Sequence, residues 1–346
     1  MSIDRRTFVC TALGTLAACT GTTRLRPAGG GFRCPPCGCA MDGVVFEKAG
    51  TCPECGMVLQ PTSEAELGFE PATIPVGAGV FDVSGGPGRS RRRIGVHVYR
   101  PASFTPTSEI LLVVPGAGRD GDEYRNAWLA VADDTGTLVA ALHYPEESYD
   151  FAAYHLGGVA REVVQRDARV ERRGRSTVVH LDDDDFQVTV EPDPARWLFA
   201  DLDRVFDFVV ERTGSSRARY LVFGHSAGGQ ILHRAALFLP RLKARRIVAA
   251  NAGFYTFPDR SEAFPLGLAG TGVGEAQLRR GLGVELTVLL GELDDGDAAG
   301  GTLLHTPRLD ARQGRSRLER GRRFVEAGRR GAERIGADFA WTFDIV

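Results

Sequence analysis

The stretch YLVFGHSAGG, residues 220–229, places one serine, Ser226, between two glycines. Gly224 and Gly228 complete a G-x-S-x-G pattern directly after the apolar run YLVF. When a strand turns into a helix through such a sequence, the turn is so tight that larger flanking side chains would clash, and the serine oxygen is exposed. The pattern is therefore typical of a nucleophilic serine, which needs a base to take its proton. The next amide, that of Ala227, would point toward the oxyanion that forms on the substrate.

Alternating strand-like and helix-like runs surround this motif. Several strand-like runs, such as ILLVV and LTVLL, are continuously apolar, as expected for strands that are buried on both faces of a sheet. The pattern predicts an α/β fold, in which helices cover both faces of a mostly parallel central sheet. The expected strands are Ile94–Tyr99, Ile110–Pro115, Leu138–His143, Tyr220–Phe223, Arg246–Ala250, Leu286–Leu290 and Phe339–Val346, and the expected helices are Glu123–Ala132, Trp197–Arg212, Gly228–Phe238 and Arg315–Ile335.

The alternation breaks down between residues 149 and 193. This stretch predicts two short strands around the acidic run Asp182–Asp185. An insertion at this place in the chain would lie near the site as a cap. The acidic run is expected to be a solvated turn, because charge runs usually are, and a calcium site is the alternative.

Composition excludes some function classes. The chain has 346 residues, of which 43% are hydrophobic and 25% charged, enough for one large domain and a small one. The net charge of −2 gives no reason to expect nucleic-acid binding. No apolar run reaches the roughly 18 residues that a membrane-spanning helix needs, so we expect none in the mature protein.

Over residues 77–346 these features resemble the α/β-hydrolase family, in particular its exported polyester-depolymerase-like and feruloyl-esterase-like members. The GHSAGG elbow and the loop PGAGRDGDEYRNAW, which follows the expected strand ILLVV, carry the resemblance. In that family the loop supplies a second oxyanion-binding amide, which here implies the N–H of Ala117. The usual His-Gly start of the loop is replaced by Pro115 and Gly116, whose backbone can approach the substrate closely.

Two aromatic residues of the same loop, Tyr124 and Trp128, are candidates to line an acyl or aromatic pocket, as is Trp197. Placement in the core or at its rim is the alternative for each of them.

The resemblance also implies a catalytic acid just after a late strand, in the form G-x-x-D. In the stretch TVLLGELDDGD, residues 287–297, Asp294 fits this form, with Asp295 and Asp297 as close alternatives. Its task would be to orient an imidazole and to stabilise the positive charge that develops there.

The base is harder to find. In the family the histidine follows both the acid and the last strand, whereas all 7 histidines of this sequence come before the last strand. His225 neighbours the serine and is expected to point away, and His305 is expected to be a surface loop residue. The resemblance implies a base within about five residues beyond residue 346. We therefore expect this chain to be truncated and nearly inactive; turnover by it would point to His305 or His155.

The N-terminal stretch MSIDRRTFVCTALGTLAACTG is typical of an export signal. A twin-arginine pair, Arg5 and Arg6, precedes a short apolar stretch that closes with Leu-Ala-Ala-Cys at Cys19. This order resembles a twin-arginine signal with the lipobox of bacterial lipoproteins, which implies cleavage before Cys19 and acylation of its sulfur. Residues 1–19 would then direct export to the cell envelope, with a lipid anchor in a membrane, at the outer membrane or facing the periplasm. A plain cleavable signal is the alternative.

Five of the 7 cysteines lie close together after this signal. Cys34 and Cys37 form one C-x-x-C pair, and Cys52 and Cys55 form a second. Two such pairs joined by a loop can hold a zinc ion tetrahedrally. Two disulfides in an oxidising compartment are the alternative. Cys39 is left as a spare or alternative ligand.

The stretch GTCPECGMVLQP, residues 50–61, resembles the second half of small heavy-metal-binding, zinc-ribbon-like domains. The resemblance implies such a domain at residues 32–61, between linkers at 20–31 and 62–76. Its first half, CPPCGC, departs from the commoner CPMHP form. No water-activating arrangement is visible, so the zinc is expected to be structural.

The leading hypothesis is an exported, lipid-anchored serine hydrolase that cleaves small-molecule or polymeric carboxylic esters without a cofactor for the hydrolase chemistry. A peptidase on the same fold and a non-catalytic metal-binding surface lipoprotein are the alternatives. No nucleic-acid partner is expected.

Overall fold

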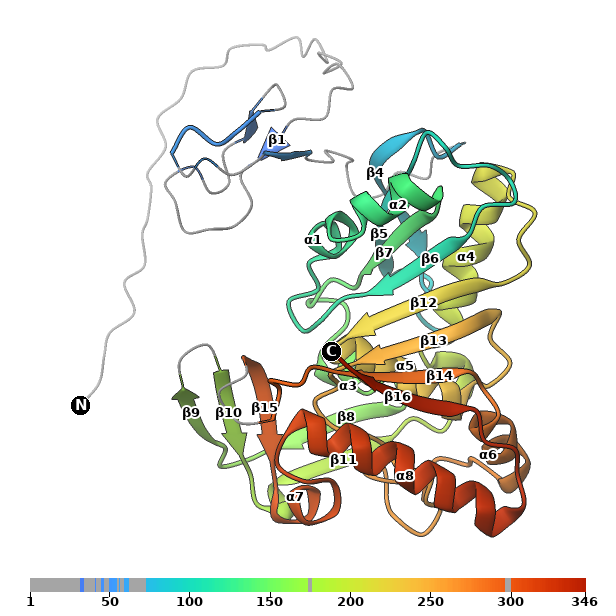
Figure 1. Cartoon of the computed structure of the whole chain (residues 1–346). Helices are drawn as coiled ribbons and strands as arrows, with labels where there is room; N and C mark the ends of the chain where they lie inside the picture. The colour runs from blue at the N-terminus through green and yellow to red at the C-terminus, as the bar shows by residue number, and fades with distance from the viewer. Residues whose placement is uncertain are drawn as a thin grey trace, which may run out of the picture.

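The computed structural model in Figure 1 describes residues 73–173, 176–295 and 300–346, and, nearer the N-terminus, residues 32–33, 41, 45–46, 50–54, 56 and 59–61. The predicted signal at residues 1–19, with Cys19, and the predicted linker at 20–31 lie outside the described residues. So do Cys34, Cys37, Cys39, Cys55 and Asp297.

An eight-stranded sheet forms the centre of the molecule, in the order β16-β14-β13-β12-β6-β7-β5-β4 (Figure 1). β4 pairs antiparallel with β5, and β5 with β7, while every other pair of neighbours is parallel. The predicted mostly parallel sheet is therefore confirmed. The strands are β4 (Gly77–Ser84), β5 (Arg93–Arg100), β6 (Ile110–Val114), β7 (Leu138–His143), β12 (Tyr220–His225), β13 (Ala244–Ala250), β14 (Leu286–Leu290) and β16 (Trp341–Ile345).

Helices cover both faces of this sheet, as predicted. Along β6, Ile110, Leu112 and Val114 belong to one buried cluster, and Leu111 and Val113 to a second cluster on the other face. The first cluster includes apolar residues of α3 (Phe151–His155), α4 (Ala200–Thr213), α5 (Ala227–Phe238), α6 (Glu275–Leu282), α7 (Pro307–Gln313) and α8 (Arg317–Ile335), and the second is completed by α1 (Gly121–Asn126) and α2 (Leu129–Thr135).

The single helix expected at Glu123–Ala132 is wrong, since α1 ends at Asn126 and α2 begins at Leu129. The strand β4 was not expected, because its sequence GAGVFDVS begins with small residues that show no apolar alternation. No helix within the described ranges is long and apolar enough to cross a membrane.

The stretch around residues 149–193 does contain short strands on both sides of the acidic run, as expected. β10 (Ser176–His180) precedes the run and β11 (Phe186–Val190) follows it, while Asp183–Asp185 form a short 3-10 helix, η1. A second 3-10 helix, η2 (Pro194–Arg196), closes the stretch. Among the described residues, no group of three His, Cys, Asp or Glu side chains is placed to hold a metal ion. Asp182, Asp183 and Asp184 are exposed.

These strands belong to two small sheets. β11 pairs with β8 (Ala160–Gln165), whereas β10 pairs antiparallel with β9 (Arg169–Arg173) and parallel with β15 (Gly301–His305). Because β15 comes from a distant part of the chain, just after the predicted acid, this pairing joins the insertion to the loop that follows β14.

A separate three-stranded sheet lies near the N-terminus, in the order β2-β1-β3. Its strands are β1 (Phe32–Arg33), β2 (Val45–Phe46) and β3 (Gln60–Pro61). Cys52 and Leu59 are buried together there, against Phe46 and Met41.

The long helix α8 packs closely on the end of the sheet through two of its glycines. A Cβ at Gly328 would lie 2.6 Å from the ring of Trp341 in β16, and one at Gly321 would overlap Leu290 in β14. The expectation of an outer helix with a solvated face holds for its other side, where Glu326 and Arg330 are exposed. The close contact fixes the first residue of the helix, Arg317, beside the site described below.

We expect Gly328→Ala to lower the free energy of unfolding by about 1–3 kcal/mol, because the added methyl group forces Trp341 to move. Gly331→Ala is the matched control in the same helix, since its Cβ would meet only Pro258 at 3.7 Å. The control should raise stability by about 0.5–1 kcal/mol through helix propensity. Urea unfolding checks both, and equal effects of the two substitutions would contradict the packing described here.

Candidate active site

Ser226 stands at the turn between β12 and α5, with a strained backbone. Its φ of 53° and ψ of −110° lie outside the regions that residues with a side chain ordinarily adopt. The Ser226 N–H donates a hydrogen bond of 2.8 Å to the carbonyl oxygen of Ala250, at the end of β13. The turn is thus fastened to the neighbouring strand, and such strain is typical of functional positions.

The two glycines of the motif are required by close backbone contacts. A Cβ at Gly224 would lie 2.6 Å from the carbonyl group of Gly228. A Cβ at Gly228 would overlap the carbonyl oxygen of Val114, at the end of β6. Only glycine fits at either place, so the sequence pattern that predicted a tight turn is explained by the packing of α5 against β6.

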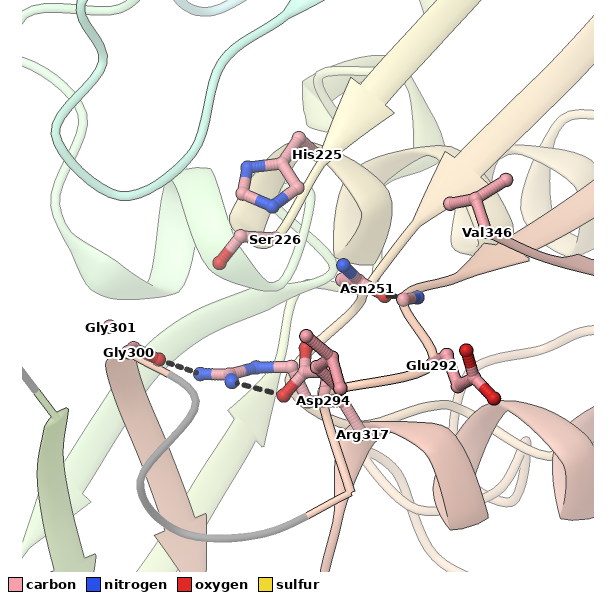
Figure 2. Close-up of a pocket in the computed structure, with 11 residues that line it drawn as sticks. His225, Ser226, Asn251, Glu292, Asp294, Gly300, Gly301, Arg317 and Val346 are labelled. Atoms are coloured by element: carbon pink, nitrogen blue, oxygen red, sulfur yellow. Dashed lines mark hydrogen bonds and ion pairs between the residues drawn. The ribbon is translucent and has the colours of Figure 1, made fainter.

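Ser226 lines a cavity of about 520 Å³. The cavity lies at the carboxyl ends of β12, β13 and β14, which is where open α/β sheets place their ligand sites (Figure 2). Its lining residues are His225, Ser226, Asn251, Gly291, Glu292, Leu293, Asp294, Gly300, Gly301, Arg317 and Val346.

Of the three candidate acids, Asp294 is the one that lines this cavity. Its Oδ1 accepts a hydrogen bond of 2.9 Å from Nη1 of Arg317, and both side chains are largely buried. Asp295 is exposed and is not among the lining residues, and Asp297 lies outside the described residues. The structure therefore brings Ser226 and Asp294 to one cavity, as the family pattern implied.

Two cavity residues were not anticipated from the sequence. Asn251 has a φ of 44°, and its Oδ1 accepts a hydrogen bond of 2.8 Å from the N–H of Gly291, which holds the start of the acid loop. Arg317 lies in an arginine-rich run that indicated only a solvated face. Asparagine directly after a strand tolerates a left-handed backbone, and this was the one signal in the sequence for Asn251.

The loop after β6 approaches Ser226 through its backbone. A Cβ at Gly116 would lie 3.6 Å from Cβ of Ser226 and 2.9 Å from the hydroxyl of Tyr124. The N–H of Arg119 closes the loop by donating to the Gly116 carbonyl oxygen at 3.0 Å. Ala117, the predicted donor residue, follows Gly116 on the exposed side of this turn.

Ala227, the other predicted donor residue, is the first residue of α5. The N–H groups of a first helical turn have no partner within the helix, and the helix dipole adds a partial positive charge there. Both effects favour negative charge on an oxygen beside Ser226.

His225 is turned toward Tyr124. Its Nδ1 and the Tyr124 hydroxyl are 2.7 Å apart. Burial, reinforced by the nearby Arg317 cation, lowers the pKa of His225, and burial raises the pKa of Tyr124. Both groups are therefore neutral at pH 7. The charge of Asp294 acts on the pKa of His225 in the opposite direction and is the smallest of these effects.

None of the other histidines lines the cavity, although all 7 lie in the described ranges. His305 is buried, which corrects the expectation of a surface residue, and its Nδ1 lies 2.7 Å from Oδ1 of Asp310. His155 stacks on Phe151, and burial with two nearby arginines lowers its pKa to about 3. Neither of the two histidines named as substitutes for the base is thus brought to Ser226.

Trp128 and Trp197 are also placed away from the cavity. Trp128 lies edge-on to Phe223, with ring centroids 5.4 Å apart, and lines a separate cavity of about 240 Å³ on the sheet face of α2. Trp197 is buried, and its Nε1 donates to the carbonyl oxygen of Glu191 at 3.2 Å. The alternative of core or rim aromatics accounts for both. Tyr124 reaches the site through its hydroxyl, which contacts His225 and lies against Gly116.

Comparison with known proteins places this geometry in a family. No family model matches the sequence, and no match was found among curated proteins. Among solved structures, poly(aspartic acid) hydrolase-1 from Sphingomonas sp. KT-1 is similar, with 33% sequence identity and a TM-score of 0.66, over 79% of this chain and 92% of that chain. The poly(3-hydroxybutyrate) depolymerase LpqC from Bordetella parapertussis is 27% identical, with a TM-score of 0.66, over 79% of this chain and 83% of that chain.

The order of the central sheet, the strained serine turn and the match to poly(aspartic acid) hydrolase-1 over most of both chains agree with one another. The chain belongs to the α/β-hydrolase family.

Proposed function

We propose that this protein is an exported serine hydrolase that cleaves carboxylic esters through an acyl-enzyme on Ser226. The observation that carries the proposal is the strained turn of Ser226 at the mouth of a cavity that Asp294 also lines. The LpqC relative is described as a depolymerase of poly(3-hydroxybutyrate), which is a polyester, and this supports esters as the substrate class.

In the proposed reaction, Oγ of Ser226 attacks the ester carbonyl carbon while an imidazole takes its proton. The N–H groups of Ala117 and Ala227 hold the oxyanion, and Gly116 lets the loop come close enough to do so. The C–O bond to the leaving alcohol then breaks, and the imidazole returns the proton to that oxygen. Water next attacks the acyl-enzyme by the same route and releases the acid. Asp294 orients the imidazole and stabilises the positive charge that develops on it.

Amide hydrolysis is the second candidate. It is favoured by the 33% identical relative, because poly(aspartic acid) is joined by amide bonds. The same nucleophile and oxyanion donors serve both reactions, and the amide differs in needing protonation of a poorer leaving group. A non-catalytic surface protein is the remaining alternative, and the first test below separates it from both hydrolases.

We expect a fluorophosphonate to label Ser226 and no other residue of the hydrolase domain. Ser226→Ala should abolish the labelling and reduce ester turnover, including the turnover that added imidazole supports, to the background rate, since the nucleophile is lost. Ser90→Ala, at an exposed serine, is the matched control and should change neither. Mass spectrometry of the labelled peptide and hydrolysis of a p-nitrophenyl ester are the measurements. An unlabelled Ser226 in an otherwise folded protein would favour the non-catalytic alternative.

Added imidazole should raise the rate at which the 346-residue chain labels and hydrolyses ester, because His225, the histidine among the residues that line the cavity, has its Nδ1 engaged by the Tyr124 hydroxyl. The cavity of about 520 Å³ beside Ser226 has room for the ring. Ser226→Ala gives the background of hydrolysis by imidazole itself, which is subtracted. Full turnover without imidazole, still dependent on Ser226, would show that a histidine of this chain does act as the base.

We also propose that Cys34, Cys37, Cys52 and Cys55 hold a structural zinc ion, and that Cys19 carries a lipid anchor. Support for the zinc is limited to the second C-x-x-C pair. Cys52 is buried, and its carbonyl oxygen accepts a hydrogen bond of 2.9 Å from the N–H of Gly56, whose φ is 72°. A tight turn of this kind fits two thiolates of one pair around a metal.

Purified protein should contain about one zinc ion per chain, as tetrahedral four-thiolate sites hold one. Cys52→Ser should lower the zinc content, because serine cannot replace a thiolate ligand, whereas Cys10→Ser, in the predicted signal, should not. Elemental analysis by mass spectrometry gives the content. Thiols paired as disulfides, with no zinc in the freshly purified protein, would instead favour the disulfide alternative.

A further inference from the structure

The charges around the Ser226 cavity differ from what a polyanionic substrate requires. One cationic side chain lines this cavity within the described residues, that of Arg317. Its Nη1 donates to Asp294 at 2.9 Å, and its Nη2 donates to the carbonyl oxygens of Gly300 and Thr302, each at 3.0 Å. Figure 2 shows the guanidinium group held between Gly300 and Asp294. The guanidinium group of Arg317 therefore makes its hydrogen bonds within the chain and is not available to bind a substrate carboxylate.

Glu292 adds a negative charge that has no ion-pair partner among the described residues. It lines the same cavity, two residues before Asp294, and its side chain is exposed. Its backbone N–H donates to Val346 at 2.7 Å, but its carboxylate forms no hydrogen bond or ion pair with any residue in the part of the chain that the structure describes. Since Arg317 balances Asp294, Glu292 leaves the cavity wall with a net negative charge.

A second carboxylate, that of Asp120, belongs to the loop that approaches Ser226, although it is not among the residues that line the cavity. A Cβ at Gly118 would overlap Oδ2 of Asp120, so this carboxylate lies directly against the backbone next to Ala117. Its charge contributes to the raised pKa of Tyr124, after the effect of burial. Asp120 thus adds negative charge to the loop that carries Ala117 and does not offset the charge of Glu292.

Two buried arginines near the site, Arg119 and Arg234, do not offset the negative charge of the cavity. Arg119 donates to the carbonyl oxygens of Tyr144 and Tyr149, and Arg234 donates to those of His155 and Gln230. Neither arginine is among the residues that line the cavity. Their guanidinium groups hold neighbouring backbone segments together and are not presented to a ligand.

We infer that the Ser226 cavity selects substrates that carry no negative charge near the scissile bond, and that Glu292 is the residue that sets this selectivity. The inference rests on the proposed function for its meaning, since it concerns the substrate of Ser226. It implies that poly(aspartic acid), named for the 33% identical relative, is a poor substrate of this chain. Neutral or cationic esters are the class that fits.

The physical reason is repulsion between like charges in a partly desolvated cavity. One carboxylate at about 8–10 Å from another, at the intermediate dielectric of a protein surface, changes relative affinity by about fivefold. Repulsive contacts of this kind commonly decide which of two similar substrates an enzyme accepts. The effect is screened at high salt because the cavity is open to solvent.

The potential at Ser226 can be measured without catalysis. Ser226→Cys is treated with two methanethiosulfonate reagents of equal size, one ending in a quaternary ammonium and one in a sulfonate. Mass spectrometry follows the peptide that spans position 226, because every native cysteine precedes residue 56. The ratio of the two rates, divided by the same ratio for a small free thiol, reports the sign of the potential and cancels the reactivity of the thiol.

We expect this normalised ratio to favour the cationic reagent by about tenfold at low salt and to fall toward one in about 0.5 M salt. In the Ser226→Cys background, Glu292→Gln should lower the ratio by about fivefold, and Glu292→Lys should lower it further. Glu333→Gln and Glu333→Lys are the matched controls, at an exposed glutamate of α8 outside the cavity, and should leave it within about twofold.

A ratio that favours the anionic reagent, or one that does not respond to Glu292, would overturn the inference. These outcomes do not depend on whether Ser226 is a nucleophile in the unsubstituted protein. Failure of fluorophosphonate labelling with a cationic preference retained would instead reject the proposed function and leave the charge of the cavity established.

Discussion

The contact between the first turn of α5 and the end of β6 is the constraint on which the rest of the site depends. Because no Cβ fits between Gly228 and the carbonyl oxygen of Val114, the helix starts directly against the sheet. This close approach forces Ser226 into a backbone conformation with a positive φ. It also directs the unpaired N–H groups of the first helical turn toward the serine oxygen. The contact between Gly228 and Val114 therefore accounts for three properties of the serine turn: its backbone strain, the exposure of the serine oxygen and the positive potential beside it.

The loop that follows β14 is organised by a different principle, hydrogen bonding across distant segments. Asn251 holds the beginning of the loop through Gly291, and Arg317 holds Asp294 and the carbonyl oxygens at the start of β15. Each of these two side chains connects elements that are far apart in sequence. The acid is thus positioned by polar contacts, while the serine is positioned by steric exclusion.

This difference explains how much could be predicted from the sequence. The G-x-S-x-G turn and buried strands such as Leu138–His143 were predicted because consecutive residues carry their pattern, and the bounds of this strand were correct. The position of Asp294 followed from a family pattern. Asn251 and Arg317 were missed because their partners are set by the tertiary fold, and the burial of His305 was missed because Asp310 and the strand pairing of β15 enclose it. The split of α1 from α2 was missed as well, and Trp128, which lies between the two helices, packs edge-on against Phe223 of β12.

The parallel pairing of β10 with β15 has a consequence for how a ligand can enter. An insertion attached only at its two ends could swing as a hinged flap. Here five consecutive residues of β10, Ser176–His180, are in register with Gly301–His305, so the insertion shares a hydrogen-bonded ladder with the segment behind the acid. Swinging it outward would break that ladder and pull on the carbonyl groups that Arg317 holds. The insertion is therefore joined by backbone hydrogen bonds to the strand whose first residue, Gly301, lines the Ser226 cavity.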